Sequence, residues 1–219
     1  RYQNGKWIKA GKIKGLNYEI RNIKQDKHGN FWLGTAFKGV VRIRNLFVNN
    51  SLNMQPEITH FTKDDGLPDL SWNVIHNYKN KILVGTAKGL YRFDEKNKRF
   101  LPFSHFGKHL ADGSHGIHTM AIDKQGNFWS AGMYPKKSTP GIALKQPDQD
   151  YSWYNMPFRR LTEGSIYFVY PEDNGQCWLG GTEGLYLYDR NQNKNYQKPY
   201  SCLLRKITLN NDSVVYWKK

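Results

Sequence analysis

A short pattern recurs three times in this chain, and it constrains the fold more than any other feature. Residues 20–32, 117–129 and 166–178 read IRNIKQDKHGNFW, IHTMAIDKQGNFW and IYFVYPEDNGQCW. Each copy has apolar residues at its first and fourth positions, then an acid, a glycine and a closing Trp. A fourth copy lies at KILVGT (81–86), where Leu83 takes the place of the Trp. The anchors at 32, 83, 129 and 178 are 51, 46 and 49 residues apart, and periods of about 40–50 residues are typical of propeller blades.

Each repeat reads as a small antiparallel sheet. In the first copy, residues 20–25 form an inner strand, Asp26 and Gly29 make a turn, and Phe31–Trp32–Leu33 begin the second strand. A third strand follows Gly39, and a weaker outer strand lies at 58–61. We therefore predict an all-β fold of four four-stranded propeller blades at about 15–65, 66–110, 111–160 and 161–199. One such sheet is too small to fold alone, so neighbouring blades must bury each other's faces.

Asn4–Gly5, between Tyr2 and Trp7–Ile8, is a strong hairpin signal. We interpret residues 1–14 as the outer hairpin of a preceding blade and expect the four blades to form part of a larger propeller. A closed four-bladed ring is the alternative.

Composition excludes several classes of protein. Aromatic residues make up 15% of the chain, which disordered chains lack, and no apolar run is long enough to cross a membrane. Two cysteines make at most one bridge, so a disulfide scaffold is excluded. The net charge of +15 suits a polyanionic partner, but the basic residues are spread along the chain, and a solvated surface explains them equally well.

Several motifs resemble the two-component regulator propeller repeat. They are the string FTKDDGLPD (61–69), the segment VGTAKGLYRFD (84–94) and the sequence GNFWLGT (29–35). The run from Cys202 to Tyr216 resembles the strand that leaves such a propeller, so we interpret residues 200–219 as the exit strand towards a following β-sandwich domain. The resemblance implies the periplasmic sensor region of a hybrid two-component system, which detects glycan breakdown products and signals through a membrane helix to a histidine kinase. It also implies a homodimer in the intact protein, with contact to the membrane only through further segments.

Catalysis has little support in the sequence. Asp26, Asp123 and Glu172 share one repeat position, which indicates turn formation rather than a catalytic pair. His105, His109, His115 and His118 lie close together, but in a region that reads as loop. We therefore expect surface histidines and no metal site. Cys177 takes the place of Phe31 and Phe128 and is expected to be a small buried apolar residue. No nucleotide-binding or hydrolase motif occurs, so we expect no catalytic residue and no cofactor.

Ligand binding is more plausible, and three segments carry candidate residues. An insertion at 133–140 places Tyr134, Lys136 and Lys137 on one loop, although a variable loop without function is the alternative. Two further segments lie at passages between blades, where a propeller rim is reached. The first contains Trp153, Tyr154, Arg159 and Arg160, and the second, before the second blade, contains Trp72 and Asn73. Core packing is the alternative for Trp153.

The sequence thus favours a non-catalytic sensor propeller whose ligand is an oligosaccharide, with an acidic sugar as the candidate suggested by the charge. Three rivals stay open. The first is a scaffold for protein contact or dimerisation, and the second is a polysaccharide-processing enzyme on a propeller. The third is nucleic-acid binding, which rests on charge alone and conflicts with a periplasmic location, so no nucleic-acid partner is expected.

Overall fold

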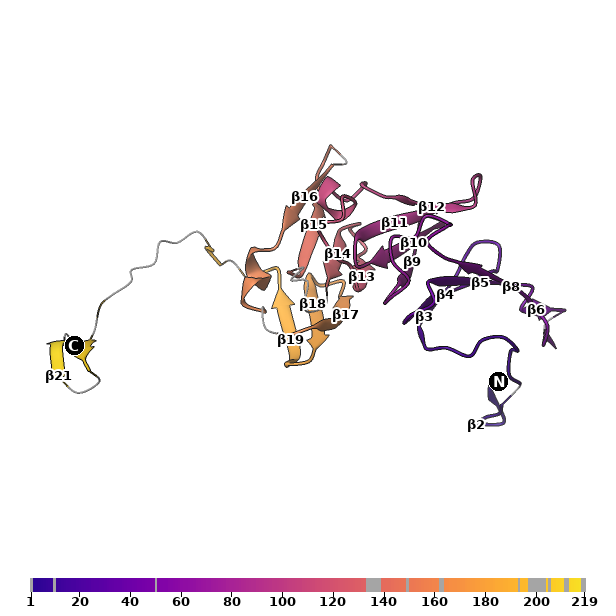
Figure 1. The fold of residues 1–219 in the computed structure, drawn as a ribbon, viewed down its shortest axis with the longest axis horizontal. Helices are drawn as coiled ribbons and strands as arrows, with labels where there is room; N and C mark the ends of the chain where they lie inside the picture. The colour runs from indigo at the N-terminus through magenta and orange to yellow at the C-terminus, as the bar shows by residue number, and fades with distance from the viewer. Residues whose placement is uncertain are drawn as a thin grey trace.

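The chain folds into a series of small antiparallel sheets (Figure 1). The computed structural model describes residues 2–9, 11–49, 51–132, 139–148, 150–161, 164–192, 194–196, 204, 206–210 and 213–217. Within these residues the helical segments are two short 3-10 turns, η1 (Lys108–Leu110) and η2 (Met156–Arg160). No helix in the described ranges is long and apolar enough to cross a membrane. The predicted all-β class is confirmed.

Four sheets follow one another along the chain, each with its strands in sequence order. The first contains β3 (Ile20–Gln25), β4 (Phe31–Thr35), β5 (Val40–Arg44) and β8 (Glu57–Phe61). The second contains β9 (Val74–Tyr78), β10 (Lys81–Thr86), β11 (Gly89–Asp94) and β12 (Arg99–Pro102). The third contains β13 (Thr119–Ile122), β14 (Phe128–Ala131), β15 (Gly141–Lys145) and β16 (Tyr151–Tyr154). The fourth contains β17 (Ile166–Pro171), β18 (Gln176–Gly181) and β19 (Gly184–Asp189).

The fourth sheet departs from the four-stranded prediction. The other three sheets each have four strands, whereas this one has three among the residues that the structure describes. Three separate hairpins complete the strands: β1 (Tyr2–Gln3) with β2 (Lys6–Trp7), β6 (Phe47–Val48) with β7 (Ser51–Leu52), and β20 (Lys206–Leu209) with β21 (Ser213–Trp217). The predicted turn at Asn4–Gly5 is present, and both residues have the positive φ angles, 49° and 75°, that such a tight turn requires. Residues 201–203, including Cys202, lie outside the described ranges.

The repeated acid closes the turn between the first two strands, as predicted, and it also holds the Trp. One oxygen of Asp26 accepts hydrogen bonds from the backbone N–H groups of His28 (2.9 Å) and Asn30 (3.0 Å). The other oxygen accepts the indole N–H of Trp32 at 2.8 Å. The same indole–carboxylate bond recurs for Trp129 with Asp123 (3.0 Å) and for Trp178 with Glu172 (2.8 Å). The acid therefore lets an indole pack between sheets with its N–H satisfied.

Apolar side chains from adjacent sheets form one core layer at each junction. Trp32 and Val40 of the first sheet pack with Ile75 and Phe93 of the second. Leu83 and Leu90 pack with Phe128 of the third sheet, and Trp129 and Ile142 pack with Cys177 and Leu179 of the fourth. Because side chains alternate along a strand, each sheet presents one face to the sheet before it and the other to the sheet after it. Cys177 is fully buried, as the sequence predicted.

The innermost strands of the four sheets lie next to one another in chain order, β3 beside β9, β9 beside β13 and β13 beside β17. The side chain of Asn22 on β3 fixes the first of these contacts, because its amide donates to the carbonyl of Ile75 (2.7 Å) and accepts from the N–H of Ile75 (2.9 Å). Asn77 donates in the same way to the carbonyl of Gln25 at 2.9 Å. These bonds join the inner strands of the first two sheets, and the contacts of β9 with β13 and of β13 with β17 continue the series through the third and fourth sheets, as in propeller blades.

Candidate ligand-binding site

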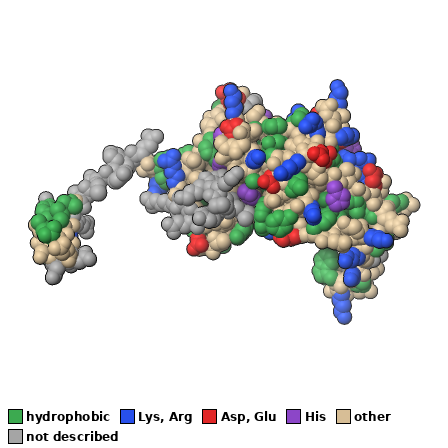
Figure 2. Space-filling view, in the orientation of Figure 1, with side chains coloured by type: hydrophobic (Ala, Val, Ile, Leu, Met, Phe, Trp, Pro, Cys, Tyr) green, Lys and Arg blue, Asp and Glu red, His purple; other side chains and the backbone are tan. Residues whose placement is uncertain are grey.

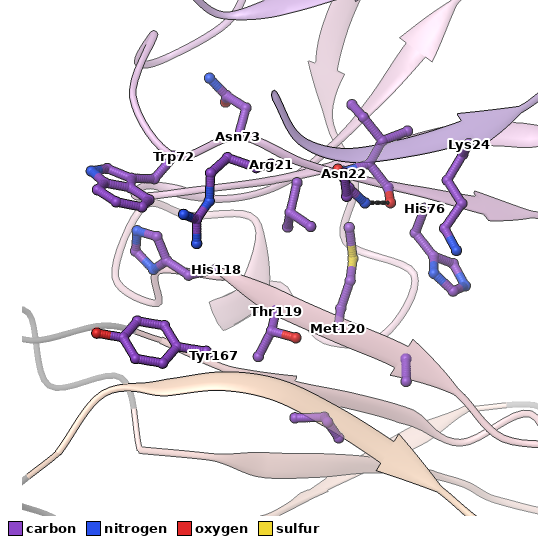
Figure 3. Close-up of a pocket in the computed structure, with 14 residues that line it drawn as sticks. Arg21, Asn22, Lys24, Trp72, Asn73, His76, His118, Thr119, Met120 and Tyr167 are labelled. Carbon is purple, nitrogen blue, oxygen red and sulfur yellow. Dashed lines mark hydrogen bonds between the residues drawn. The ribbon is translucent and has the colours of Figure 1, made fainter. Parts of the chain in front are cut away.

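The inner strands of all four sheets line one pocket of about 320 Å³ (Figure 3), which we call the axial pocket. Its wall includes residues of β3, β9, β13 and β17, together with the segment that enters β9. The polar and aromatic side chains that line it are Arg21, Asn22, Lys24, Trp72, Asn73, His76, His118, Thr119 and Tyr167. Ligand pockets in proteins occupy about 300–1,000 Å³, so the axial pocket is of a size for a small ligand or one unit of a larger one.

Three of these side chains occupy the same position in different copies of the repeat. Arg21, His118 and Tyr167 each follow the first apolar residue of their repeat copy, namely Ile20, Ile117 and Ile166. The pairing of β3 with β4 shifts register at Arg21, and the pairing of β17 with β18 shifts at Tyr167. A bulge redirects the side chain of the extra residue, and bulges are common beside functional sites. The repeat therefore delivers a different polar or aromatic side chain from each of three sheets to the same pocket.

Trp72 and Arg21 form a stacked pair at one end of the pocket. The guanidinium carbon of Arg21 lies 4.4 Å from the centre of the Trp72 ring, and the ring edge of Phe37 packs against Trp72 at 5.7 Å. Trp72 has a φ of 55°, in the left-handed region that bulky residues avoid, and its N–H donates to the carbonyl of Ala36 at 2.8 Å. Strain of this kind persists where the surroundings hold a residue in place, and it is often found at functional sites.

The axial pocket is cationic. Arg21 and Lys24 contribute positive charges, and no carboxylate belongs to the described residues that line it. Arg21 pairs with Glu19 at 3.0 Å, but that carboxylate lies outside the lining and is itself well exposed. Burial lowers the pKa of His76 to about 4, assisted by the charge of Lys24. Burial also lowers the pKa of His118, and Arg21 lowers it further, so both imidazoles are neutral at pH 7 and can donate or accept hydrogen bonds.

Both of the residues predicted before the second sheet reach this region. Trp72 lines the pocket directly, whereas Asn73 is fully buried and its amide donates to the carbonyl of Asp69 at 3.3 Å. The backbone carbonyl of Asn73 packs so closely on Gly34 that a side chain there would collide with it. Asn73 also lines the pocket, and its close approach to Gly34 packs this segment against the first sheet.

Trp153, Tyr154 and Arg159 lie away from the axial pocket. Trp153 packs in the core of the second junction, with ring-centre distances of 4.8 Å to His109 and 5.1 Å to His115. Tyr154 lines a separate hollow of about 300 Å³ with Tyr188 and Arg190, and Arg159 is exposed on η2. Tyr134, Lys136 and Lys137 lie outside the described residues, and so does the side chain of Arg160.

The prediction of surface histidines is wrong for three of the four, because His105 is exposed whereas His109, His115 and His118 are partly buried. His109 and His115 are partly buried against Trp153, and the Nε2 atom of each is enclosed without a hydrogen-bond partner. Burial lowers the pKa of His115 to about 4, with a further contribution from His109. These imidazoles are packed neutral because the hairpin geometry of the third sheet places Trp153 over them. No group of three or more potential metal ligands occurs among the described residues.

Sequence reasoning missed Arg21, His76, His118 and Tyr167. The repeat alignment contained the signal for three of them, because the residue after the first apolar anchor is polar or aromatic in every full copy. The alignment did not show that the inner strands of four sheets converge on one cavity. That convergence depends on how the sheets pack.

Four consecutive sheets whose inner strands surround one pocket define a β-propeller. Residues 14–37, which include the motif GNFWLGT (29–35), match the model of the two component regulator propeller family. No curated protein sequence matches the chain.

Several solved structures are similar in fold, and two of them are informative. One is the crystal structure of the extracellular domain of BT3049 from B. thetaiotaomicron, described as a hybrid two component system. It has a TM-score of 0.56 and 22% sequence identity, over 82% of this chain and 23% of that one. The other, YCF48 bound to D1 peptide, has a TM-score of 0.51 and 12% identity, over 82% of this chain and 53% of that one. The chain thus spans about a quarter and about half of the lengths of these proteins, and at such identities the similarity is one of fold.

Proposed function

We propose that this chain is the ligand-binding propeller segment of an extracytoplasmic sensor, and that it binds an acidic oligosaccharide in the axial pocket. The sensor belongs to a hybrid two-component system, lies in the periplasm and passes its signal to a histidine kinase. The match of residues 14–37 to the regulator propeller family supports the sensor role. The main support for a sugar ligand is that four side chains meet at one cavity: Arg21, Trp72, His118 and Tyr167.

The chemistry of the pocket suits a sugar. Pyranose rings present C–H faces that pack on aromatic rings, and Tyr167, which is 48% exposed, offers such a face in the pocket wall. His76 and His118 in their neutral state, with Thr119, supply the mixture of donors and acceptors that hydroxyl groups require. In Figure 3 the labelled side chains Trp72, Arg21, His118 and Tyr167 lie along the same side of the pocket.

The charge of the pocket favours an acidic sugar over a neutral one. A guanidinium binds a carboxylate with two parallel hydrogen bonds, and the cation–π contact with Trp72 keeps the guanidinium of Arg21 at one end of the pocket. Lys24 adds a second cation from the same strand. Lysine and arginine side chains are scattered over the face shown in Figure 2, so the overall charge of +15 attracts an anion from a distance while the pocket confers selectivity.

A sensor of this kind is non-catalytic. Asp26, Asp123 and Glu172 are occupied in holding the indole N–H groups, so the repeated carboxylates serve structure. The lining of the pocket within the described ranges holds no carboxylate to act as general acid or base. Incubation with a glycan panel followed by chromatography is expected to release no product.

Binding is tested by calorimetry with a uronate-containing disaccharide and with its neutral counterpart of the same linkage. We expect the acidic sugar to bind at least about tenfold more tightly, and Arg21→Ala to remove that difference. Arg44→Ala is the matched control, because Arg44 also pairs with a glutamate on the surface (Glu57, 3.3 Å) but lies away from the pocket. Equal affinity for the two sugars would refute the acidic ligand, and failure of every sugar in the panel would refute the sugar proposal itself.

A further inference from the structure

The loop between β4 and β5 is one residue longer than the corresponding loops of the second and fourth sheets. Those loops have two residues, 87–88 and 182–183, between the last paired residues of their strands. The loop of the first sheet has three, 36–38. Its sequence Ala-Phe-Lys differs from the Ala-Lys of the second sheet by the insertion of Phe37. The additional residue of this loop is therefore an aromatic one.

The side chain of Phe37 points away from the core and lies at the margin of the axial pocket. Phe37 is 59% exposed, whereas the residue before it in the loop is buried. Its ring stands edge-on to Trp72, with the ring centres 5.7 Å apart and the planes at 74°. Trp72 lines the pocket and stacks on Arg21. Phe37 therefore extends the aromatic surface outward from the cationic end of the pocket.

Two backbone hydrogen bonds join this loop to the segment before β9, one on each side of Phe37. Before it, the carbonyl of Ala36 accepts the N–H of Trp72 at 2.8 Å. After it, the N–H of Gly39 donates to the carbonyl of Leu70 at 2.8 Å. Because the loop is tied down on both sides, the ring of Phe37 is held in place before any ligand arrives. A surface that is already ordered loses little conformational freedom on binding.

The size of the pocket determines what such a ring can contact. The axial pocket of about 320 Å³ has room for a small ligand or one unit of a larger one, so the next units of an oligosaccharide lie outside it. A unit that leaves the pocket at the Arg21 end passes Trp72 and then meets Phe37. The C–H face of a pyranose packs on an aromatic ring, and Phe37 offers an exposed one.

We infer that Phe37 forms a second subsite, which binds a further sugar unit of the acidic oligosaccharide whose charged unit lies at Arg21. The inference rests on the proposed function and deepens it, because it makes the ligand a chain of several units rather than a single sugar. Lys38 is exposed in the same loop and adds a positive charge beside the ring, which favours an acidic unit at this subsite as well.

Calorimetry with galacturonic acid and with its 1,4-linked dimer and trimer tests the subsite. We expect the wild-type chain to bind the trimer at least about fivefold more tightly than the monomer, as one additional aromatic contact allows. Phe37→Ala is expected to lose most of this gain and to leave the affinity for the monomer unchanged, because the contacts inside the pocket remain. Phe37→Tyr keeps the ring and is expected to bind all three sugars as the wild type does.

Phe47→Ala is the matched control. Phe47 is 57% exposed on β6, and its ring packs on Phe31 at 6.0 Å, away from the pocket. Its removal is expected to leave all three affinities unchanged.

The outcomes separate the subsite from the proposed function. Equal affinity of the wild type for monomer and trimer overturns the subsite and leaves the acidic ligand standing. An equal loss for monomer and trimer in Phe37→Ala also overturns the subsite, because Phe37 would then act only by holding Trp72. If no sugar of the series binds to the wild type, the acidic ligand of the proposed function is refuted, and the subsite is refuted with it.

Discussion

Replacing Asp26 with alanine tests whether the repeated acid stabilises the propeller through the indole of its own repeat. Asp26 accepts the N–H of Trp32 at 2.8 Å, and Trp32 is fully buried in the first core junction. Without the carboxylate, the N–H of this buried indole loses the bond that satisfies it. An unsatisfied buried donor costs about 1–3 kcal/mol.

The other bonds of Asp26 add a smaller amount. The backbone N–H groups of His28 and Asn30, held at 2.9 and 3.0 Å, lie in a more exposed turn and can bond to water when the acid is removed. Each then contributes about 0.5 kcal/mol or less. We expect Asp26→Ala to lower the free energy of unfolding by about 1–4 kcal/mol, which for a chain of this length lowers Tm by roughly 2–16 °C.

Urea unfolding followed by circular dichroism measures this loss. Asp112→Ala is the control, because Asp112 accepts a backbone bond from Ser114 (2.8 Å) in an exposed turn and holds no buried donor, so the midpoint is expected to stay nearly unchanged. A loss in Asp26→Ala no greater than that of the control would refute the reasoning.

The dependence on pH supplies a second check. Burial raises the pKa of Asp26, but the bonds from Trp32, Asn30 and His28 lower it more, so the pKa lies below its ordinary value of 3.8. A lowered carboxyl pKa contributes stability above the unfolded value and loses it as pH falls through the folded value. The difference in stability between wild type and Asp26→Ala is therefore expected to narrow below about pH 4.

Three further predictions concern the junctions between sheets. Burial lowers the pKa of His115 to about 4 against an ordinary value of 6.5. As pH falls from about 6.5 towards 4, the unfolded chain therefore takes up a proton at this histidine before the folded chain does, and the free energy of unfolding decreases. His115→Gln is expected to weaken this pH dependence, which urea titrations at about pH 7 and pH 5 measure. Asn22→Ala removes both bonds to Ile75 and is expected to cost about 1–3 kcal/mol, with faster hydrogen exchange of the Ile75 amide; unchanged exchange would contradict its bridging role. Gly141→Ala places a methyl group against the ring of Trp153 and is expected to lower the free energy of unfolding by about 1–3 kcal/mol. The loss is measured as a lower Tm and an altered near-ultraviolet circular dichroism spectrum. An unchanged Tm would show that the ring moves aside freely.

Much of the local structure followed from the sequence. The spacing of Trp32, Leu83 and Trp129 predicted the second strand of each sheet, and Asp26 with Gly29 predicted the turn, since these residue types satisfy a turn without help from distant parts of the chain. The bond from the acid to the indole was not predicted, although the same spacing carries it. A role in the turn is enough to account for the repeated carboxylate, and nothing in the sequence indicated that it also binds the indole.

The candidate site was also predicted from the sequence only in part. Trp72 was predicted and lines the axial pocket, whereas Trp153, chosen for the same reason, lies in a core junction. The two differ in what packs around them. Trp72 lies in the segment that enters an inner strand, and Trp153 lies in an outer strand over the histidines of the preceding crossing.

The sequence by itself determined the repeat, the all-β class and the placement of most strands, because strand period and turn chemistry are local properties of the chain. The tertiary structure alone decided which side chains meet. Arg21, His118 and Tyr167 are far apart in sequence and become neighbours of one cavity only because inner strands pack side by side and bulges redirect two of them.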